Sequence, residues 1–291
     1  MSLVRDLEAL GQYQELLGDS QCNFLAKLWT LQDEMAPTDF RWEPLSKHEI
    51  YRLTRANTPL LSKAKDKIDL IAFVEAFNNI LALYTEEIFS SELSAKLQAL
   101  DSLGEHDLDQ ALFDDVKILE RVFSKQAFLD DDAKSCLTLV VYSTLRVFRA
   151  AYASQIKEID FGEYDFPDTH TCPVCGAEAS LSIINRPIAF NGGLRNHYCS
   201  SCDTQWHYTR IKCAFCGESG QERLRYFYTP DDEAHRVHAC KSCKGIMAAI
   251  NLKFFTLKFS PRVEELVSLL KAREIFQDAS IDKFLSDSSI K

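Results

Sequence analysis

The sequence predicts an α+β fold with a helical N-terminal domain, two tandem small β modules of the zinc-ribbon type, and a C-terminal helix. Apolar residues recur at helical spacing through roughly the first half of the chain. Eight cysteines of the second half form four CxxC pairs, and short alternating runs typical of strands lie between them. The predicted domains are residues 1–165, 166–211, 212–258 and 259–291.

The N-terminal domain is predicted to be helical along its length. In residues 61–89, apolar side chains recur in alternating steps of four and three, which places them on one helix face. A second helix is predicted over residues 131–157, and its nearly all-apolar middle indicates the buried centre of a bundle. Cys22 and Cys136 lie within helical patterns and are expected to be small buried apolar residues. Weaker helical patterns cover residues 6–17, 21–35, 92–100 and 108–123.

The helical pattern ends at residues 160–168, where a Gly, a Pro and several acids indicate a linker. Strands are predicted beyond it, at residues 179–184, 205–211 and 222–228. Pro261–Ala272 again has helical spacing, and the last dozen residues are expected to be loosely ordered.

The cysteine pairs belong to an internal duplication. Shifting the sequence by 41 positions superposes all eight cysteines, and also Arg195 on Arg236 and His197 on His238. Each repeat holds one CxxC pair followed by Gly and, 23 residues later, a second CxxC pair. The cysteines are Cys172, Cys175, Cys199 and Cys202 in the first repeat, and Cys213, Cys216, Cys240 and Cys243 in the second.

Two CxxC turns aim four sulfurs at one centre, which is a tetrahedral site suited to zinc or to a single iron. One ion per repeat is the natural assignment, although a crossed pairing of the turns remains possible. Four thiolates leave no ligand position open for water, which disfavours hydrolytic metal catalysis. Occupied pairs likewise disfavour a dithiol oxidoreductase. The ions are therefore expected to be structural, or else redox centres.

Several residues near the cysteines are candidates for other roles. Trp206 follows Cys202 by four positions and is expected to pack over the site. Trp206, His207 and Arg210, which lie on one run, are also the candidates to meet a partner. The histidines near the cysteines are expected to support the sites or lie at the surface rather than ligate. The sequence contains no Ser/His/Asp arrangement, paired catalytic carboxylates or phosphate-binding Gly loop above chance, so we do not expect an enzyme.

The formal net charge of −10 argues against a general nucleic-acid binder, which would need clustered Lys and Arg. Residues 172–258 carry 11 Lys and Arg against 7 Asp and Glu, a surplus that offsets the charge of the thiolate sites or recognises an anion or partner. No apolar run is long enough to cross a bilayer. Asp6 and Glu8 lie where a secretory signal would be apolar, so we expect a cytoplasmic protein.

These motifs resemble the formate dehydrogenase accessory protein family, FdhE. The resemblance lies in the CPVCG turn at Cys172, in the run Leu194-Arg-Asn-His-Tyr-Cys-Ser-Ser-Cys-Asp-Thr-Gln-Trp-His207, in Arg210-Ile-Lys-Cys-Ala-Phe-Cys216 and in the last CxxC. It implies two rubredoxin-like modules with iron or zinc, one ion in each. It also implies a cytoplasmic assembly factor that contacts the catalytic subunit of formate dehydrogenase before export.

Two alternatives to a maturation factor remain open at the level of sequence. One is a rubredoxin-like electron carrier, which requires iron in the cysteine sites. The other is a zinc-ribbon nucleic-acid module, against which the overall acidity counts. The sequence does not define the oligomeric state.

Overall fold

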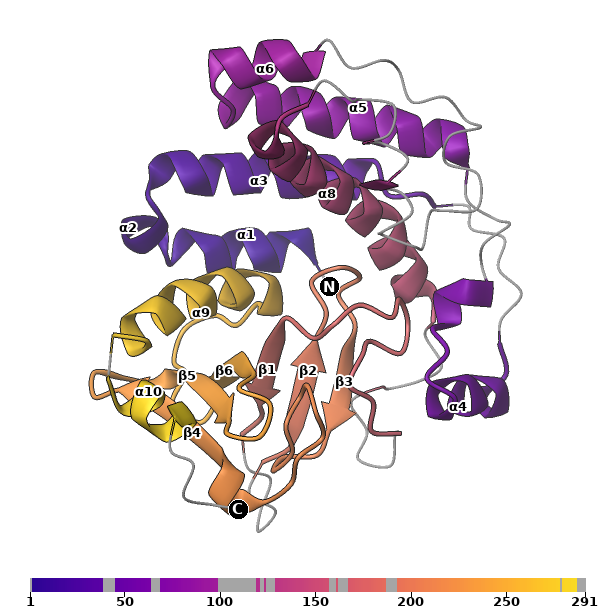
Figure 1. The fold of residues 1–291 in the computed structure, drawn as a ribbon. Helices are drawn as coiled ribbons and strands as arrows, with labels where there is room; N and C mark the ends of the chain where they lie inside the picture. Colours follow the sequence, from indigo (N-terminus) through magenta and orange to yellow (C-terminus); the bar gives the residue numbers. More distant parts are fainter. Residues whose placement is uncertain are drawn as a thin grey trace. The chain divides into compact units, whose positions relative to one another are not determined.

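A computed structural model of the chain describes most of its length. The described residues are 2–38, 45–63, 69–98, 119–120, 123, 129–156, 161, 167–186, 193–277 and 279–286. They fall into two compact units that interleave along the sequence. The helical unit contains Tyr13–Leu45 and Leu60–Ile156, and the sheet unit contains Met1–Gln12, Ser46–Pro59 and Lys157–Lys291 (Figure 1).

The helical unit is a bundle in which α3, α5 and α8 contact one another, and α6 contacts α5 and α8. Asp69 caps α5 by accepting the backbone N–H groups of Ile71 and Ala72, so this helix begins later than the predicted residue 61. The predicted central helix is confirmed as α8, whose Leu137 and Leu145 are fully buried. The elements are α2 (Gln14–Leu17), α3 (Asp19–Glu34), η1 (Leu60–Lys63), α5 (Leu70–Glu87), α6 (Ser91–Gln98) and α8 (Asp131–Gln155).

The helix predicted over residues 108–123 lies almost entirely outside the described residues. Cys22 is buried as expected, whereas Cys136 is half-buried. Among the helices that the structure describes, none combines the length and the apolar character needed to cross a membrane.

The sheet unit is built on one sheet of six strands in the order β3-β2-β1-β6-β5-β4. Neighbouring strands are antiparallel except β1 and β6, which pair in parallel and join the two repeats. The predicted β modules are therefore present, but they share a sheet rather than forming separate ones. The strands are β1 (Leu181–Ile184), β2 (Arg195–Tyr198), β3 (Gln205–Tyr208), β4 (Leu224–Thr229), β5 (Asp232–Cys240) and β6 (Ile246–Asn251).

The duplication extends to the pairing of the strands. Arg195 lies opposite Tyr208 in the β2–β3 hairpin, and Arg236 lies opposite Ala249 in the β5–β6 hairpin, each shifted by 41 positions. The second hairpin is thus a copy of the first in register, so side chains at equivalent positions face the same side of the sheet in both modules.

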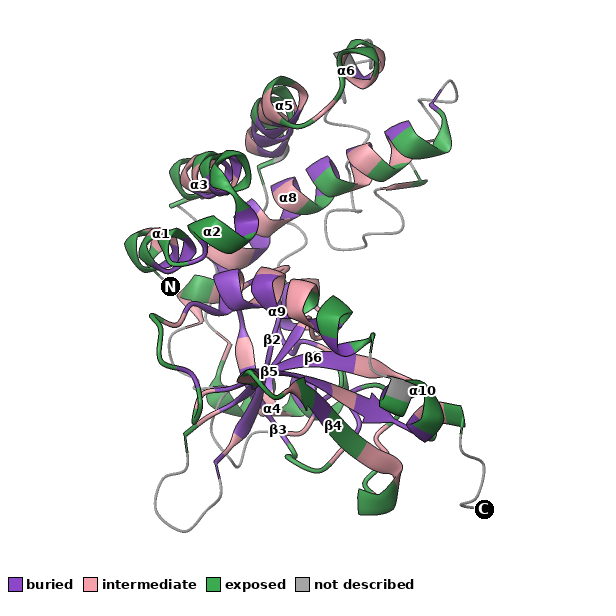
Figure 2. Cartoon of the chain, turned by 90° about the vertical axis from the view of Figure 1, so that its left-hand side faces the viewer, coloured by how far each residue is buried: buried purple, intermediate pink, exposed green. Residues whose placement is uncertain are grey.

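Helices cover one face of this sheet, where α9 contacts β1, β4, β5 and β6 (Figure 1). The apolar side chains beneath it include Val237 of β5 and Ala272 of α9. Figure 2 shows the strands largely buried, with β4 at the sheet edge the most exposed. The helices of this unit are α1 (Leu3–Gly11), α4 (Lys47–Arg55), η4 (Gln221–Arg223), α9 (Pro261–Ile275) and α10 (Ala279–Ser286).

Three helices of the sheet unit differ from the sequence-based expectation. The first, α1, belongs to this unit and not to the helical one, since it contacts α9 and Ser260 donates to Asp6 at 2.6 Å. The second, α4, was not predicted, although Ser46 and Glu49 form a capping box at its start. The third, α10, lies in the segment expected to be loose. The compact units therefore do not follow the predicted boundary at residue 165.

Candidate metal centres

Four cysteines of the first repeat converge on one point. The Sγ atoms of Cys172 and Cys202 are 3.5 Å apart, and those of Cys175 and Cys199 are 3.4 Å apart. All four sulfurs lie within 4.8 Å of one another, and all four residues are buried. Cys172 and Cys175 come from the loop before β1, and the other two follow β2. The cluster combines both CxxC pairs of one repeat, as the uncrossed assignment predicts.

The second repeat forms an equivalent cluster with a different exposure. Between its two CxxC pairs, the Sγ atoms of Cys213 and Cys243 are 3.6 Å apart, and those of Cys216 and Cys240 are 3.7 Å apart. Cys216 and Cys243 are exposed, whereas the other two are buried. This site therefore opens to solvent on one side, and the first site is closed. We call the two clusters site 1 and site 2.

The same backbone turn builds all four CxxC pairs. In the first turn of each repeat, Gly176 and Gly217 adopt positive φ angles of 82° and 74°, and each donates its N–H to the carbonyl oxygen of the first cysteine of its turn. Asp203 and Lys244 fill the same position in the second turns, both with φ of 62°. The left-handed residue after each pair bends the chain so that both sulfurs point to one side.

The donor sets fit a tetrahedral ion. A zinc–sulfur bond of about 2.3 Å places neighbouring sulfurs about 3.8 Å apart, close to the cross-pair distances of 3.4–3.7 Å. In site 2, the backbone N–H groups of Phe215 and Gly245 approach the sulfurs of Cys213 and Cys243 at 3.4 and 3.3 Å. Such N–H groups stabilise thiolates. Each cluster could therefore hold one metal ion.

Thiol pKa values differ between the two clusters. In site 1, burial is the main cause that raises the pKa of Cys202, and the neighbouring thiols are the main cause for Cys199. In site 2, burial raises the pKa of Cys240 and of Cys243 as well. Burial also opposes ionisation of Cys213, but backbone N–H groups of Cys216 and Phe215 hold the pKa of that thiol below the ordinary value. Buried thiols become ligands only when a cation offsets their charge, so metal binding at site 1 is coupled to proton release.

Aromatic residues fill the sheet face beside site 1. Trp206 is fully buried, and its Nε1 donates to the carbonyl oxygen of Thr169 at 3.0 Å. His197 lies between Trp206 and Tyr208, with ring centroids 5.5 and 4.3 Å away. Burial holds the pKa of His197 well below its ordinary value, so the ring is neutral. Trp206 is therefore a buried residue of this face, and its packing over site 1 stays a prediction.

Only one of the three residues predicted to meet a partner is exposed. Trp206 and His207 are buried, whereas Arg210 lies at the surface in the segment between the modules. Among the histidines of this region, His197 and His238 lie at equivalent places on β2 and β5. Neither belongs to a four-cysteine cluster.

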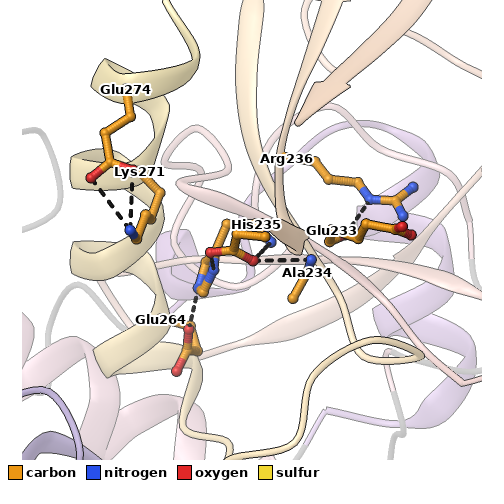
Figure 3. Close-up of polar contacts among 8 residues, drawn as sticks. Glu233, Ala234, His235, Arg236, Glu264, Lys271 and Glu274 are labelled. Atoms are coloured by element: carbon orange, nitrogen blue, oxygen red, sulfur yellow. Dashed lines mark hydrogen bonds and ion pairs between the residues drawn. The ribbon is translucent and has the colours of Figure 1, made fainter. Parts of the chain in front are cut away.

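A buried charged network was not predicted. The Nδ1 of His235 on β5 donates to Asp232 Oδ2 at 2.7 Å, and its Nε2 donates to Glu264 Oε2 at 3.0 Å. Glu264 is fully buried on α9 (Figure 3). Burial opposes protonation of His235, but the hydrogen bonds to the two carboxylates raise its pKa to about 9. The network therefore carries a protonated histidine and ties α9 to the sheet. The sequence places His235 three residues after Asp232, but nothing in it links this histidine to Glu264, which lies 29 residues further on.

Comparison with known proteins places these sites in a family context. Residues 171–210 match the FdhE central domain family. FdhE from Escherichia coli is 32% identical over 154 residues, which cover 50% of this chain and 47% of that protein. An FdhE homolog from Edwardsiella ictaluri is 32% identical over 109 residues, or 36% of this chain and 33% of that protein. The chain thus spans about half the length, or less, of these curated relatives.

The fold also matches a solved structure. The structural alignment with the crystal structure of the FdhE protein from Pseudomonas aeruginosa includes 95% of this chain and 91% of that chain. The TM-score is 0.62 at 23% sequence identity. The family match at site 1, the curated FdhE relatives and this shared fold confirm that the chain resembles the FdhE proteins.

Proposed function

We propose that this chain is an accessory protein for the assembly of active formate dehydrogenase, and that it binds the catalytic subunit of that enzyme in the cytoplasm. The observation that carries the proposal is the pair of four-cysteine clusters within a chain that resembles FdhE. Four sulfurs per ion leave no position for a substrate, which suits a binding protein better than a metal hydrolase. Contact with the subunit would involve the helical unit and both modules.

Each cluster is proposed to hold one ion of iron or zinc, with Cys172, Cys175, Cys199 and Cys202 at site 1 and Cys213, Cys216, Cys240 and Cys243 at site 2. The ions would hold the CxxC turns folded, and the sheet would present its exposed side chains to the partner. Arg210 and the exposed Tyr226 and Tyr228 of β4 are candidates for that contact.

A deletion strain tests the proposal. Removing the gene should abolish formate dehydrogenase activity while the catalytic subunit is still made, and restoring the full chain should recover activity. The variant Arg273→Gln, on the exposed side of α9, should restore activity as well as the wild type. Unchanged enzyme activity in the deletion strain, or no co-purification of the catalytic subunit with the chain, would refute the role.

One observation favours a second candidate, a rubredoxin-like electron carrier. Cys216 and Cys243 bring the edge of site 2 to the surface, where electron exchange with a partner needs it. Such a function requires iron. Anaerobic purification followed by metal analysis and a visible spectrum separates the two: zinc alone, without visible absorption, excludes the electron carrier.

A further inference from the structure

A cavity of about 450 Å³ lies on the sheet face opposite α9, beside site 2. This volume is within the range of small-molecule sites. The alternation of side chains along β5 shows which face this is. His235 contacts Glu264 of α9 and Val237 packs in the core beneath α9, so Arg236 and His238, which alternate with them, point to the opposite face. Figure 3 shows the side chains of His235 and Arg236 leaving β5 on different sides.

The duplication explains why the cavity exists. In the first module, Trp206 and Tyr208 of β3 fill this face of the sheet and are completely buried. At the equivalent positions of the second module, 41 residues later, stand Met247 and Ala249. The smaller side chains leave space beside an arginine and a histidine that both modules keep. The second module therefore lacks the large aromatic side chains of the first module but has the same arginine and histidine.

Cationic groups dominate the polar lining of this space. Among the described residues that line it, four arginines and one lysine are present and no Asp or Glu. The cations are Arg195, Arg210, Lys212, Arg225 and Arg236.

Arg236 is held in place with its terminal nitrogens available. It is 8% exposed, and its Nε donates to the carbonyl oxygen of Glu233 at 2.8 Å. Its guanidinium stacks over Tyr226 and Tyr228, at 4.9 and 5.1 Å from the ring centroids. Its terminal nitrogens make no hydrogen bond to any residue within the described ranges. A guanidinium fixed in this way is preorganised to bind an oxyanion.

Arg195 reaches the same cavity from the first module. Its Nε donates to Ser182 Oγ at 2.6 Å and its Nη1 donates to the carbonyl oxygen of Lys212 at 2.7 Å. These bonds immobilise a side chain that is only 3% exposed. Arg195 and Arg236 are equivalent in the repeat, so the two modules each contribute one buried guanidinium.

The positive charge exceeds what site 2 itself can offset. Four thiolates around a divalent ion carry −4 + 2 = −2, and two thiolates of that cluster, Cys213 and Cys240, line the cavity. Lys212 is paired with Asp168 at 2.8 Å, which leaves the four arginines. Their balance against the loaded site is +4 − 2 = +2. A negatively charged ligand would neutralise this remaining positive charge.

We propose that this cavity binds an organic anion, with a phosphate or carboxylate group on Arg195 and Arg236 and an apolar body against Phe215 and Tyr226. The exposed rings of Phe215 and Tyr226 and the side chain of Ile211 supply the apolar part of the lining. Arg210 and Arg225 add charge at the more exposed edge of the cavity.

Isothermal titration of the metal-loaded full chain with phenyl phosphate tests the proposal. We expect binding, and tighter binding than that of inorganic phosphate because the ring contacts the apolar lining. Arg236→Gln should weaken phenyl phosphate about tenfold, as the loss of a charged hydrogen bond does. Arg210→Gln and Arg225→Gln, which remove charge only at the exposed edge, should each weaken it by a smaller factor. Arg273→Gln, which removes an equal charge outside the cavity, should leave the affinity unchanged.

Met247→Trp restores the residue of the first module and should abolish binding by filling the cavity. Two ions per chain and an unchanged unfolding temperature would show that this variant is folded. No binding of phenyl phosphate to the wild type, or an equal loss in Arg273→Gln, overturns the proposal. So does binding of a tetraglutamate peptide without binding of phenyl phosphate, which would assign the cavity to an acidic protein segment.

Discussion

Gly245, two residues after the last cysteine, occupies a position where no side chain fits. A Cβ atom there would lie 2.4 Å from the ring of Phe215 and 3.1 Å from the sulfur of Cys243. Gly245→Ala is therefore expected to displace a ligand of site 2 and reduce the metal content from two ions per chain toward one, measured by elemental analysis. Gly11→Ala is the control, because nothing lies within 4 Å of a Cβ at that position. Two ions retained in Gly245→Ala would contradict the steric argument.

His235 makes stability depend on pH on the alkaline side. Its folded pKa of about 9 lies above the ordinary value of 6.5, because Asp232 and Glu264 stabilise the charged ring. The contribution to stability is therefore complete below pH 6.5 and is lost as pH rises through 9; it amounts to about 3 kcal/mol. Denaturant unfolding of the metal-loaded chain between pH 6 and pH 10 measures it.

Glu264→Gln separates this effect from general alkaline destabilisation. The amide keeps a hydrogen-bonding group beside His235 but removes one of the two negative charges. The alkaline loss of stability should then begin at a lower pH than in the wild type. If the wild type and the variant lose stability over the same pH range, His235 is excluded as the origin of the alkaline loss of stability.

Residues that belong to a repeated motif were predictable, and contacts made by tertiary packing alone were not. Each CxxC turn follows from local spacing, and the grouping of the turns into two clusters follows from the 41-residue duplication, although Cys172 and Cys202 are 30 positions apart. The His235–Glu264 contact joins residues 29 positions apart through the packing of α9 on the sheet. No periodic pattern encodes such a contact.

At the level of elements, α4 depends on its capping box. Ser46 Oγ accepts the N–H of Glu49, and the Glu49 carboxylate accepts the N–H of Ser46 in return. Ser46→Ala should lower the free energy of unfolding of the sheet unit by about 1 kcal/mol. Ser135→Ala, at an exposed position inside α8, should be close to neutral because alanine favours helix interiors. Equal effects of the two substitutions would contradict a capping role.

The two modules are expected to differ in how fast they release their ions. All four cysteines of site 1 are buried, whereas Cys216 and Cys243 of site 2 are exposed. A chelator that forms a coloured complex should therefore remove metal in two phases of equal amplitude, with site 2 the faster. Cys216→Ser should remove or accelerate the fast phase alone. A single phase for the wild type would show that exposure of the sulfurs does not control release.

Strands and helices were predictable to different degrees. The helices α3, α5, α8 and α9 were predicted because each has a long apolar face that repeats at helical spacing. Strands β2 and β5 were missed because their sequences, RNHY and DEAHRVHAC, are rich in polar and charged residues, and β6 was missed because IMAAIN has no alternation of polar and apolar residues. The shared sheet was also missed, because the β1–β6 pairing has no sequence signal.

For the whole molecule, the two compact units should respond differently to metal removal. Ion binding in small cysteine modules contributes on the order of 10–16 kcal/mol to folding, and both clusters lie in the sheet unit. The helical unit has its own core on α3, α5 and α8. After chelation, hydrogen exchange should show loss of protection in all six strands of the sheet and retained protection in α5 and α8. Loss of protection throughout would show that the units unfold together.

The parallel pairing of β1 with β6 sets an order for folding during synthesis. Ser182 pairs with Ala249, 67 residues further along the chain, so β1 leaves the ribosome well before its second neighbour exists. Until then, only β2 can pair with it, and a first cluster that closes at this stage does so on a sheet that is still incomplete. A ribosome-bound chain ending before residue 246 is therefore a natural stage at which the first ion is loaded and the second site is still open.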